Sequence, residues 1–211
     1  MDTGLTAEIW AEQWQYYANN PIQMAPVLPL TQDEFFHFCQ QNRKLRFERT
    51  AKGELILMPP AGGESSAQSL SVAAQLYVWS KRLGKGKAFD SSVGFILPNG
   101  ANRSPDAAWL TDEQLATITP EQMRKFPPVC PEFVIEVMSP SDRLPAAKRK
   151  MQEWMRAGVE LAWLIDGDEQ TVHVYRAGHD GAEILTGILK ISGEGPVAGF
   201  ELDLTDIWAG L

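Results

Sequence analysis

The chain has 211 residues, of which 44% are hydrophobic and 22% are charged, and its formal net charge is −8. This composition predicts a globular protein with a substantial core and excludes a disordered chain. The negative charge disfavours nucleic-acid binding over the whole surface, because phosphate contacts depend on Lys and Arg. The apolar runs are too short to span a membrane and the N-terminus has no basic leader, so we expect neither export nor membrane insertion.

Two further features of the composition bear on location and partners. The cysteines, Cys39 and Cys130, stand apart without a CxxC or Cys/His spacing. They argue against a disulfide framework or a zinc site and suit a reducing cytoplasm, which is the location we expect. Lys and Arg are concentrated in two segments, 81–87 and 143–156. Each segment is either a solvated helix face or a local site of phosphate contacts.

The first half of the chain begins with an arm. Residues 1–30 combine a short helical segment with the proline-rich stretch NPIQMAPVLP, and residues 31–211 are predicted to form a single domain. A helix is expected from Thr31, followed by a hairpin built from LRFERT and GELILMPP. The segment Ser65–Lys81 has apolar residues at helical spacing and predicts an amphipathic helix that ends at Gly84. These apolar residues are Ala67, Leu70, Ala74, Tyr77 and Val78.

The second half predicts the centre of the sheet. AFDSSVGFIL and SPDAAWL form a hairpin around a PNG turn, and TDEQLATITPEQMRKFPP is a surface excursion with helical turns. EFVIEVM is apolar on both faces, which indicates a central strand. Ser141 and Asp142 are candidate caps of a helix over residues 143–157 that Gly158 ends, and ELAWLID and TVHVYR follow as strands. The order predicts a mixed α/β (α+β) domain with a central mixed sheet flanked by helices.

Two carboxylates occur in or beside these apolar strands. Glu136 shares a strand face with Val134 and Met138, where an ionised carboxylate costs several kcal/mol unless a cation offsets it. Asp106 follows Pro105, which removes one ladder donor and predicts a strand entrance beside a cleft. Two acids on neighbouring strands share a proton or hold a cation, and all-oxygen ligation suits Mg²⁺ or Mn²⁺. This pattern predicts hydrolytic metal chemistry, with a glycosidase-like acid pair as the alternative.

One cation of the helix over residues 143–157 falls on its apolar side. Lys150 lies between Ala147 and Trp154 in the apolar stripe, so its ammonium group is directed towards the sheet. There it can reach Glu136 or a bound phosphate as a compact charge. The alternative is a lysine whose stem covers apolar surface while its head stays in water. For Asp106 the alternative is an ordinary turn residue, and for Glu136 it is a partly exposed residue at the end of a strand.

The segments RSPDAAW, PEFVIEVMSPSD, KMQEWMRAGVELAWLID and VHVYR carry a resemblance to a known family. They resemble the bacterial Uma-two family of restriction endonucleases, within the PD-(D/E)XK nuclease superfamily, from about GELILMPPAGGE to the C-terminus. The resemblance implies a restriction-endonuclease-like core in which a hairpin carries the Asp and a neighbouring strand carries the Glu. Asp106 and Glu136 match these acids. Lys150, four residues before Trp154, matches a lysine supplied by the following helix.

The resemblance also implies the chemistry. The superfamily usually places its lysine two residues after the second acid, where this chain has Met138. Glu64 matches an acidic position near the metal, although the helix dipole also explains a Glu in the first helical turn. The implied activity is hydrolysis of DNA phosphodiester bonds, with Mg²⁺, or Mn²⁺ as substitute, held by Asp106, Glu136 and Glu64. Lys150 would position the attacking water or stabilise charge on the phosphate.

A second hypothesis is a catalytically inactive protein of nuclease fold that binds nucleic acid or another protein. Fold does not imply function, and the acidic net charge favours this alternative. The presence of both acids and the lysine opposes it. We expect a homodimer, because closed two-fold pairs are the commonest assemblies and cutting both DNA strands is simplest with two sites. The proline-rich arm is a candidate for the dimer contact.

Overall fold

The computed structural model describes residues 23–24 and 30–210, in two compact units, Met1–Pro59 and Pro60–Leu211. The boundary at Pro59 and Pro60 falls inside residues 31–211, which the sequence predicts to be one domain. The arm predicted for residues 1–30 lies outside the described residues, apart from 23–24 and 30. Among the helices of the described residues, none is both long enough and apolar enough to cross a membrane.

The first unit contains one helix and a small antiparallel sheet. Its elements are β1 (Gln23–Met24), α2 (Gln32–Gln41), β2 (Arg46–Arg49) and β3 (Leu55–Met58). β2 and β3 form the predicted hairpin, and β1 pairs with β3. α2 begins where predicted, because the Thr31 hydroxyl accepts a hydrogen bond from the Glu34 amide while the Glu34 carboxylate accepts from the Thr31 amide.

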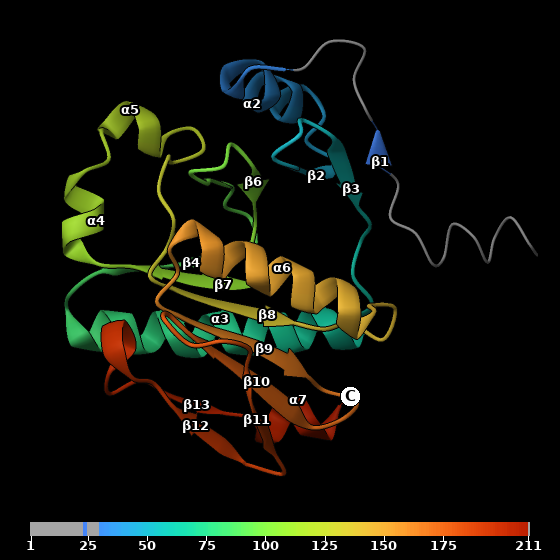
Figure 1. The fold of residues 1–211 in the computed structure, drawn as a ribbon, viewed down its shortest axis with the longest axis vertical. Helices are drawn as coiled ribbons and strands as arrows, with labels where there is room; N and C mark the ends of the chain where they lie inside the picture. The colour runs from blue at the N-terminus through green and yellow to red at the C-terminus, as the bar shows by residue number, and fades with distance from the viewer. Residues whose placement is uncertain (1–22, 25–29, 211) are drawn as a thin grey trace, which may run out of the picture. The chain divides into compact units, whose positions relative to one another are not determined.

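The second unit is built on a six-stranded mixed sheet with the order β11-β10-β9-β8-β7-β4 (Figure 1). The pair β8 and β9 is parallel, and the other neighbours are antiparallel. These strands are β4 (Lys87–Asp90), β7 (Ala107–Leu110), β8 (Phe133–Val137), β9 (Leu161–Asp166), β10 (Thr171–Arg176) and β11 (Glu183–Thr186). The predicted mixed α/β fold with a central mixed sheet is confirmed.

Shorter elements lie between the strands of this sheet and after its last strand in the sequence, β11. A hairpin of two short strands around the PNG turn lies between β4 and β7 in the sequence, and another short pair follows β11. These elements are β5 (Phe95–Ile96), β6 (Asn102–Arg103), α4 (Asp112–Ala116), α5 (Pro120–Met123), β12 (Lys190–Ser192), η1 (Gly195–Val197), β13 (Glu201–Asp203) and α7 (Thr205–Ala209).

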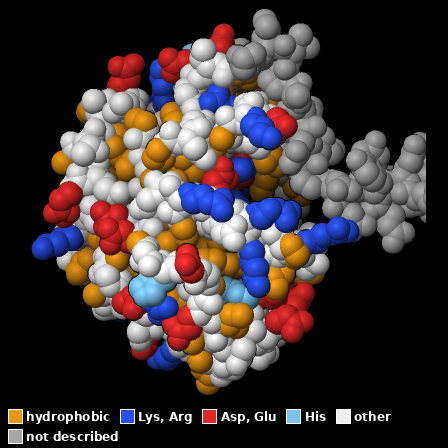
Figure 2. All heavy atoms as spheres, in the orientation of Figure 1, with side chains coloured by type: hydrophobic (Ala, Val, Ile, Leu, Met, Phe, Trp, Pro, Cys, Tyr) orange, Lys and Arg blue, Asp and Glu red, His pale blue; other side chains and the backbone are white. Residues whose placement is uncertain are grey.

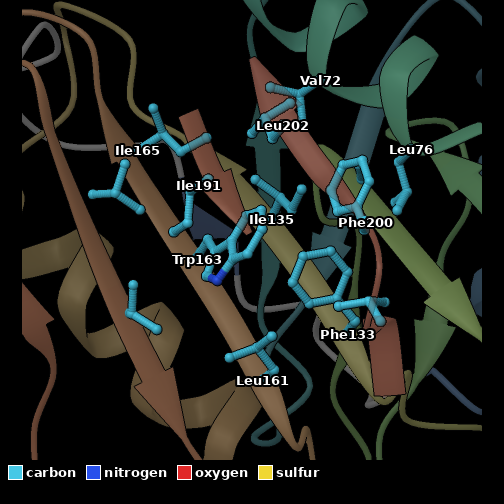
Figure 3. Packing of buried hydrophobic residues seen from close by; sticks show 14 of the residues in the cluster. Val72, Leu76, Phe133, Ile135, Leu161, Trp163, Ile165, Ile191, Phe200 and Leu202 are labelled. Carbon is cyan, nitrogen blue, oxygen red and sulfur yellow. The ribbon is translucent and has the colours of Figure 1, made fainter. Parts of the chain in front are cut away.

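Two long helices, α3 (Gly63–Leu83) and α6 (Leu144–Ala157), cover opposite faces of the sheet. On the α3 side, Val72 and Leu76 pack with Phe133, Ile135 and other residues of β8 and β9 (Figure 3). On the α6 side, two buried side chains of the helix pack against the other face of the same strands. These contacts join Met151 and Trp154 to Val134 and Leu164. β8 is therefore covered on both faces, as its apolar sequence predicts.

α3 confirms the predicted helix but not the face that its apolar stripe suggests. The buried residues are Ser65, Gln68, Val72, Leu76 and Ser80. In contrast, Leu70 is 69% exposed and Tyr77 is 55% exposed. The buried polar groups have partners: the Gln68 amide donates to the Ile207 carbonyl, and the Ser80 hydroxyl accepts from the Trp109 indole. Because these polar side chains have hydrogen-bond partners, they can be buried without a large energetic cost.

Gly86 lies in a turn where a side chain has no room. It has φ +63°, and a Cβ atom there would lie 2.2 Å from the Trp109 ring and 2.6 Å from the Leu110 carbonyl oxygen. We expect Gly86→Ala to lower the free energy of unfolding by about 3 kcal/mol, through overpacking and backbone strain together. Gly84→Ala is the control, because Gly84 has φ +68° and no atom within 4 Å of its Cβ position. Equal losses for the two variants in chemical denaturation would contradict the steric argument.

Candidate active site

Glu136 lies in β8, and Asp106 directly precedes the neighbouring strand β7. β7 and β8 are antiparallel with Ala107 opposite Ile135, so continuing the register by one residue places Asp106 opposite Glu136. The backbone amide of Val137 donates a hydrogen bond of 2.8 Å to Oδ2 of Asp106. Asp106 is thereby fixed beside the end of the strand that carries Glu136.

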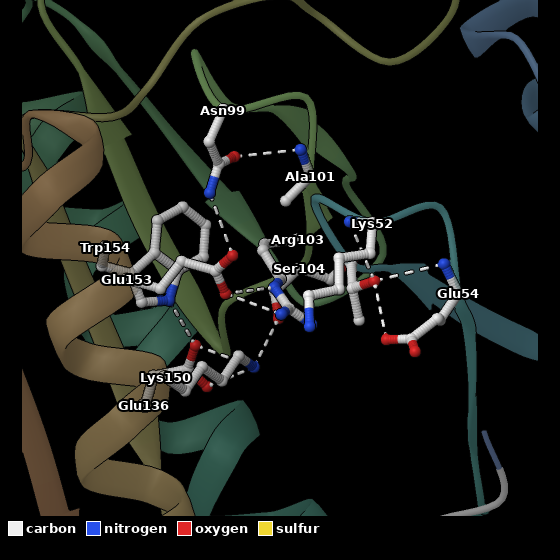
Figure 4. A network of polar contacts seen from close by, with 11 residues as sticks. Lys52, Glu54, Asn99, Ala101, Arg103, Ser104, Glu136, Lys150, Glu153 and Trp154 are labelled. Atoms are coloured by element: carbon white, nitrogen blue, oxygen red, sulfur yellow. Dashed lines mark hydrogen bonds and ion pairs between the residues drawn. The ribbon is translucent and has the colours of Figure 1, made fainter.

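Glu136 is buried, with 8% of its surface exposed, and both of its carboxylate oxygens are engaged. The Trp154 indole N–H donates to Oε1 at 2.8 Å. The Lys150 ammonium lies 2.9 Å from Oε1 and 3.0 Å from Oε2 (Figure 4). Both partners come from α6, so the helix supplies the cation and the hydrogen bond that offset the cost of burying this carboxylate.

Lys150 links Glu136 of β8 to the segment that precedes β7. Its side chain is 24% exposed, and its ammonium group also donates to the Ser104 carbonyl at 3.2 Å. Ser104 lies two residues before Asp106. The helical pattern correctly predicts that this lysine faces the sheet, since its neighbours Met151 and Trp154 are fully buried. The ammonium group is therefore held at the acids rather than extended into water.

The surroundings of Asp106 disfavour its charge. Burial raises the pKa of the Asp106 carboxyl, and the nearby Asp142 carboxylate acts in the same direction. The Val137 amide, the Lys150 charge and the Ser69 hydroxyl, which donates to Oδ1 at 3.0 Å, oppose this rise without cancelling it. A cation beside Asp106 would favour the ionised form further.

Two partners of the acids are not found by sequence reasoning. The sequence pattern assigns Trp154 only to the apolar stripe of the helix. Its position one turn after Lys150 nevertheless places both side chains on the same helix face. Ser69 gives no signal, because it is one of several serines in SSAQSLS at the start of α3. Its contact with Asp106 depends on how α3 crosses the sheet, which local pattern does not encode.

The predicted N-caps of α6, Ser141 and Asp142, are wrong, whereas the helix ends at Gly158 as predicted. The N-cap residue is Arg143, whose side chain makes no capping hydrogen bond. The Asp142 carboxylate accepts instead from the backbone amide of Ser139 at 2.8 Å and from its hydroxyl at 2.9 Å. This local turn uses the side chain that would otherwise bond the first helical amides.

Glu64 lies apart from the other predicted ligands. It is exposed in the first turn of α3, and its Oε1 atom lies 2.9 Å from the position of a Cβ built on Gly210. It lines a hollow together with Asp206 and Ala209 of α7. Within residues 23–24 and 30–210, no group of three or more His, Cys, Asp or Glu side chains is arranged to hold a metal. The structure brings Asp106, Glu136 and Lys150 together and does not bring Glu64 to them.

The remaining acid pair fits a hard divalent cation. Its donor atoms are all oxygen, the ligand type that Mg²⁺ and Mn²⁺ prefer. Mg²⁺ is commonly bound by one or two carboxylates, with water and substrate phosphate completing its shell. Two protein carboxylates therefore suffice for such an ion.

The fold of the chain is similar to that of a solved structure. A crystal structure from Anabaena variabilis, described as a "putative nuclease belonging to DUF820", matches with a TM-score of 0.65 and 22% sequence identity. The match covers 86% of this chain and 98% of that chain. The chain therefore shares its fold with that protein, in agreement with the predicted fold class.

The family is defined more closely by sequence. The model of the Uma2 family, described as "Putative restriction endonuclease", matches residues 32–205, and the chain belongs to this family. The resemblance inferred from the strand and helix segments is thereby confirmed. A search of curated proteins found no significant match. Membership supports a nuclease function.

Proposed function

We propose that this protein is a divalent-metal-dependent endonuclease that hydrolyses phosphodiester bonds in DNA. The observation that carries the proposal is the meeting of three chemical groups at one end of β7 and β8. The Asp106 carboxyl is bonded to the Val137 amide, and the Glu136 carboxylate to the Lys150 ammonium group. A chain of the Uma2 family with this arrangement has the groups that metal-dependent phosphate hydrolysis needs.

Asp106 and Glu136 would hold Mg²⁺, or Mn²⁺ as its substitute. When bound, such an ion polarises a phosphoryl oxygen and lowers the pKa of a coordinated water. The protein holds both carboxylates in fixed positions before substrate arrives, Asp106 through Val137 and Ser69, and Glu136 through α6. Glu64 is not included in this ligand pair, because it lies at α7 instead.

Lys150 is the third group of the proposed centre. Its ammonium group makes a contact with each Glu136 oxygen and with the Ser104 carbonyl, so its position is set by the protein. A compact positive charge fixed beside the scissile phosphate would stabilise the negative charge that develops there, or orient the attacking water. Because the charge is already placed, little reorganisation accompanies the reaction.

Positive side chains near this centre support a nucleic-acid substrate. Arg149 and Arg156 are exposed on the outer side of α6, and Arg143 is exposed at its start. Figure 2 shows Lys and Arg side chains gathered over the face on which α6 lies. Local contacts of this kind can bind phosphates although the net charge of the whole chain is −8.

The test is cleavage of DNA by the purified full chain. Plasmid, linear duplex and single-stranded DNA would be incubated with Mg²⁺, with Mn²⁺, and with a chelator. We expect cleavage that depends on the metal and is lost in Asp106→Asn. The exposed turn residue Asp168 gives the control Asp168→Asn, which removes the same charge elsewhere. If the wild-type protein binds DNA but cleaves none of these substrates with either metal, the inactive binding module is the better account.

The raised pKa of Asp106 predicts how metal affinity depends on pH. Burial is the main cause of the rise, and metal binding requires the ionised carboxylate. Protons therefore compete with the metal up to a higher pH than for an ordinary Asp. We expect the Mn²⁺ affinity of the wild-type protein, measured by calorimetry, to increase from mildly acidic to neutral pH. An affinity that stays constant over this range would contradict a role of Asp106 as the titrating ligand.

The same shift has an opposite effect on the metal-free fold. A carboxyl whose pKa is higher in the folded state than in the unfolded state contributes stability below the unfolded pKa, and that contribution is lost as pH rises through the folded pKa. Added Mn²⁺ should restore the lost stability. Thermal unfolding with and without the metal across this pH window measures both effects.

A further inference from the structure

We propose that the exposed apolar face of α3 is a homodimer interface, on which two copies of this chain pack their α3 helices antiparallel about a two-fold axis. The proposal rests on the surface of this one helix. It does not depend on nuclease activity or on metal binding, and its test measures association alone.

The interface would be formed by the α3 stripe, defined here as Ala67, Leu70, Ala74, Tyr77 and Val78. Leu70, Tyr77 and Val78 are 69%, 55% and 44% exposed, and Ala74 is exposed as well. The first four members follow each other at intervals of three, four and three residues. This spacing keeps a row of apolar side chains on one side of a helix and is the pattern by which helices pair.

Packing within residues 23–24 and 30–210 does not account for this stripe. The opposite side of α3 already packs on the sheet through Val72 and Leu76, both fully buried. Two polar residues on that side, Gln68 and Ser80, are buried and hydrogen-bonded. A helix that buries polar residues and exposes a row of large apolar ones is the reverse of an ordinary surface helix. Exposed apolar patches of this kind mark surfaces that bind a partner.

Charge at the two ends of α3 identifies the partner as a second copy. Glu64 lies in the first turn, and Lys81 and Arg82 lie in the last turn, all of them exposed. An antiparallel pair places the acidic end of each helix against the basic end of the other. The opposed helix dipoles are also favourable in this arrangement. A parallel pair would instead place acid against acid and base against base.

The register of such a pair is consistent with its side chains. Glu64 and Arg82 are separated by about five full helical turns, so they lie on the same flank of the stripe. With Ala74 near the two-fold axis, Glu64 meets the partner's Arg82. Leu70 then meets the partner's Tyr77 and the partner's Val78. The small Ala74 at the centre allows the two helices to approach closely.

The first experiment measures the mass of the full chain in solution by sedimentation equilibrium over a range of concentrations. We expect the wild-type chain to be a dimer and Leu70→Glu to raise the dissociation constant by about tenfold or more. Leu189 is the matched control, because it is 62% exposed but lies outside α3, so Leu189→Glu should leave the dimer intact. A wild-type monomer at all concentrations, or equal effects of the two variants, would overturn the proposal.

The second experiment tests the antiparallel register. We expect Arg82→Glu alone to weaken the dimer, and Glu64→Arg alone to do the same, because each places like charges together across the axis. The double variant Glu64→Arg/Arg82→Glu should recover most of the wild-type affinity. If both single variants leave the dissociation constant unchanged, or if the double variant is weaker than either of them, the antiparallel pairing is wrong. Circular dichroism of each variant checks that α3 remains folded.

Discussion

Glu136→Gln is expected to lower metal-dependent DNA cleavage by more than about 100-fold, since losing even an outer-shell partner of a metal ligand typically costs 10- to 100-fold. The substitution keeps the size of the side chain and an oxygen that can accept from the Trp154 indole at Oε1. It removes the charge that holds the metal and pairs with Lys150. The loss should therefore come from chemistry and metal binding rather than from packing.

The measurement is the rate of plasmid cleavage at a Mn²⁺ concentration that saturates the wild-type protein, with circular dichroism to compare the folds. Glu160→Gln is the matched control, because Glu160 is an exposed Glu that loses the same charge without touching the site. Cleavage by Glu136→Gln at the wild-type rate would remove Glu136 from the proposed centre. In that case the buried carboxylate would have only a structural role with Lys150 and Trp154.

Lys150→Met is expected to lower the stability of the metal-free protein by about 3 kcal/mol. Methionine fills a similar volume, so the main effect is to leave the Glu136 carboxylate, 8% exposed, without its cation. We place the loss at the lower end of the range for broken buried pairs because the Lys150 side chain is 24% exposed and water screens part of the interaction. Chemical denaturation in the presence of a chelator measures this value.

The double variant Glu136→Gln/Lys150→Met separates the charge effect from packing. It removes both members of the ion pair, so it should be more stable than Lys150→Met alone. A double variant less stable than the single one would show that Lys150 stabilises the fold through contacts other than Glu136, such as the Ser104 carbonyl. Cleavage should be lost in both variants, because each lacks the ammonium group.

The centre of the fold follows from local sequence pattern. EFVIEVM predicts a strand buried on both faces, and β8 has neighbours on both sides and helices on both faces. The period of a strand places Glu136 on one face, and the period of a helix places Lys150 towards it. Each pattern needs only the neighbouring residues, so the pairing of these two side chains could be anticipated. The antiparallel register then adds Asp106.

The remaining features depend on contacts between distant segments. The buried side of α3 contains Gln68 and Ser80, whose partners are Ile207 and Trp109, residues far away in the sequence. Hydrophobic spacing alone selects the apolar stripe, which is the exposed side. Asp142 is likewise used by a turn with Ser139 rather than by the helix that follows it.

In the metal-free protein, the ion pair with Lys150 balances the charge of the Glu136 carboxylate. The Lys150 ammonium group contacts both oxygens of the Glu136 carboxylate and so supplies a positive charge there when no metal is bound. Metal binding then adds a second positive group to a site that contains two carboxylates, Asp106 and Glu136. The ionised form of both acids is favoured in that state, which agrees with the expected rise of metal affinity with pH.

The central claim is that Asp106 and Glu136 together bind a divalent metal. Calorimetric titration of Mn²⁺ into the metal-free full chain tests it most directly, with Asp106→Asn and Glu136→Gln beside the wild type. We predict saturable binding to the wild-type protein that is lost in both variants, with or without a short DNA duplex. No saturable binding to the wild type even with the duplex present, or undiminished binding in both variants, would contradict the claim.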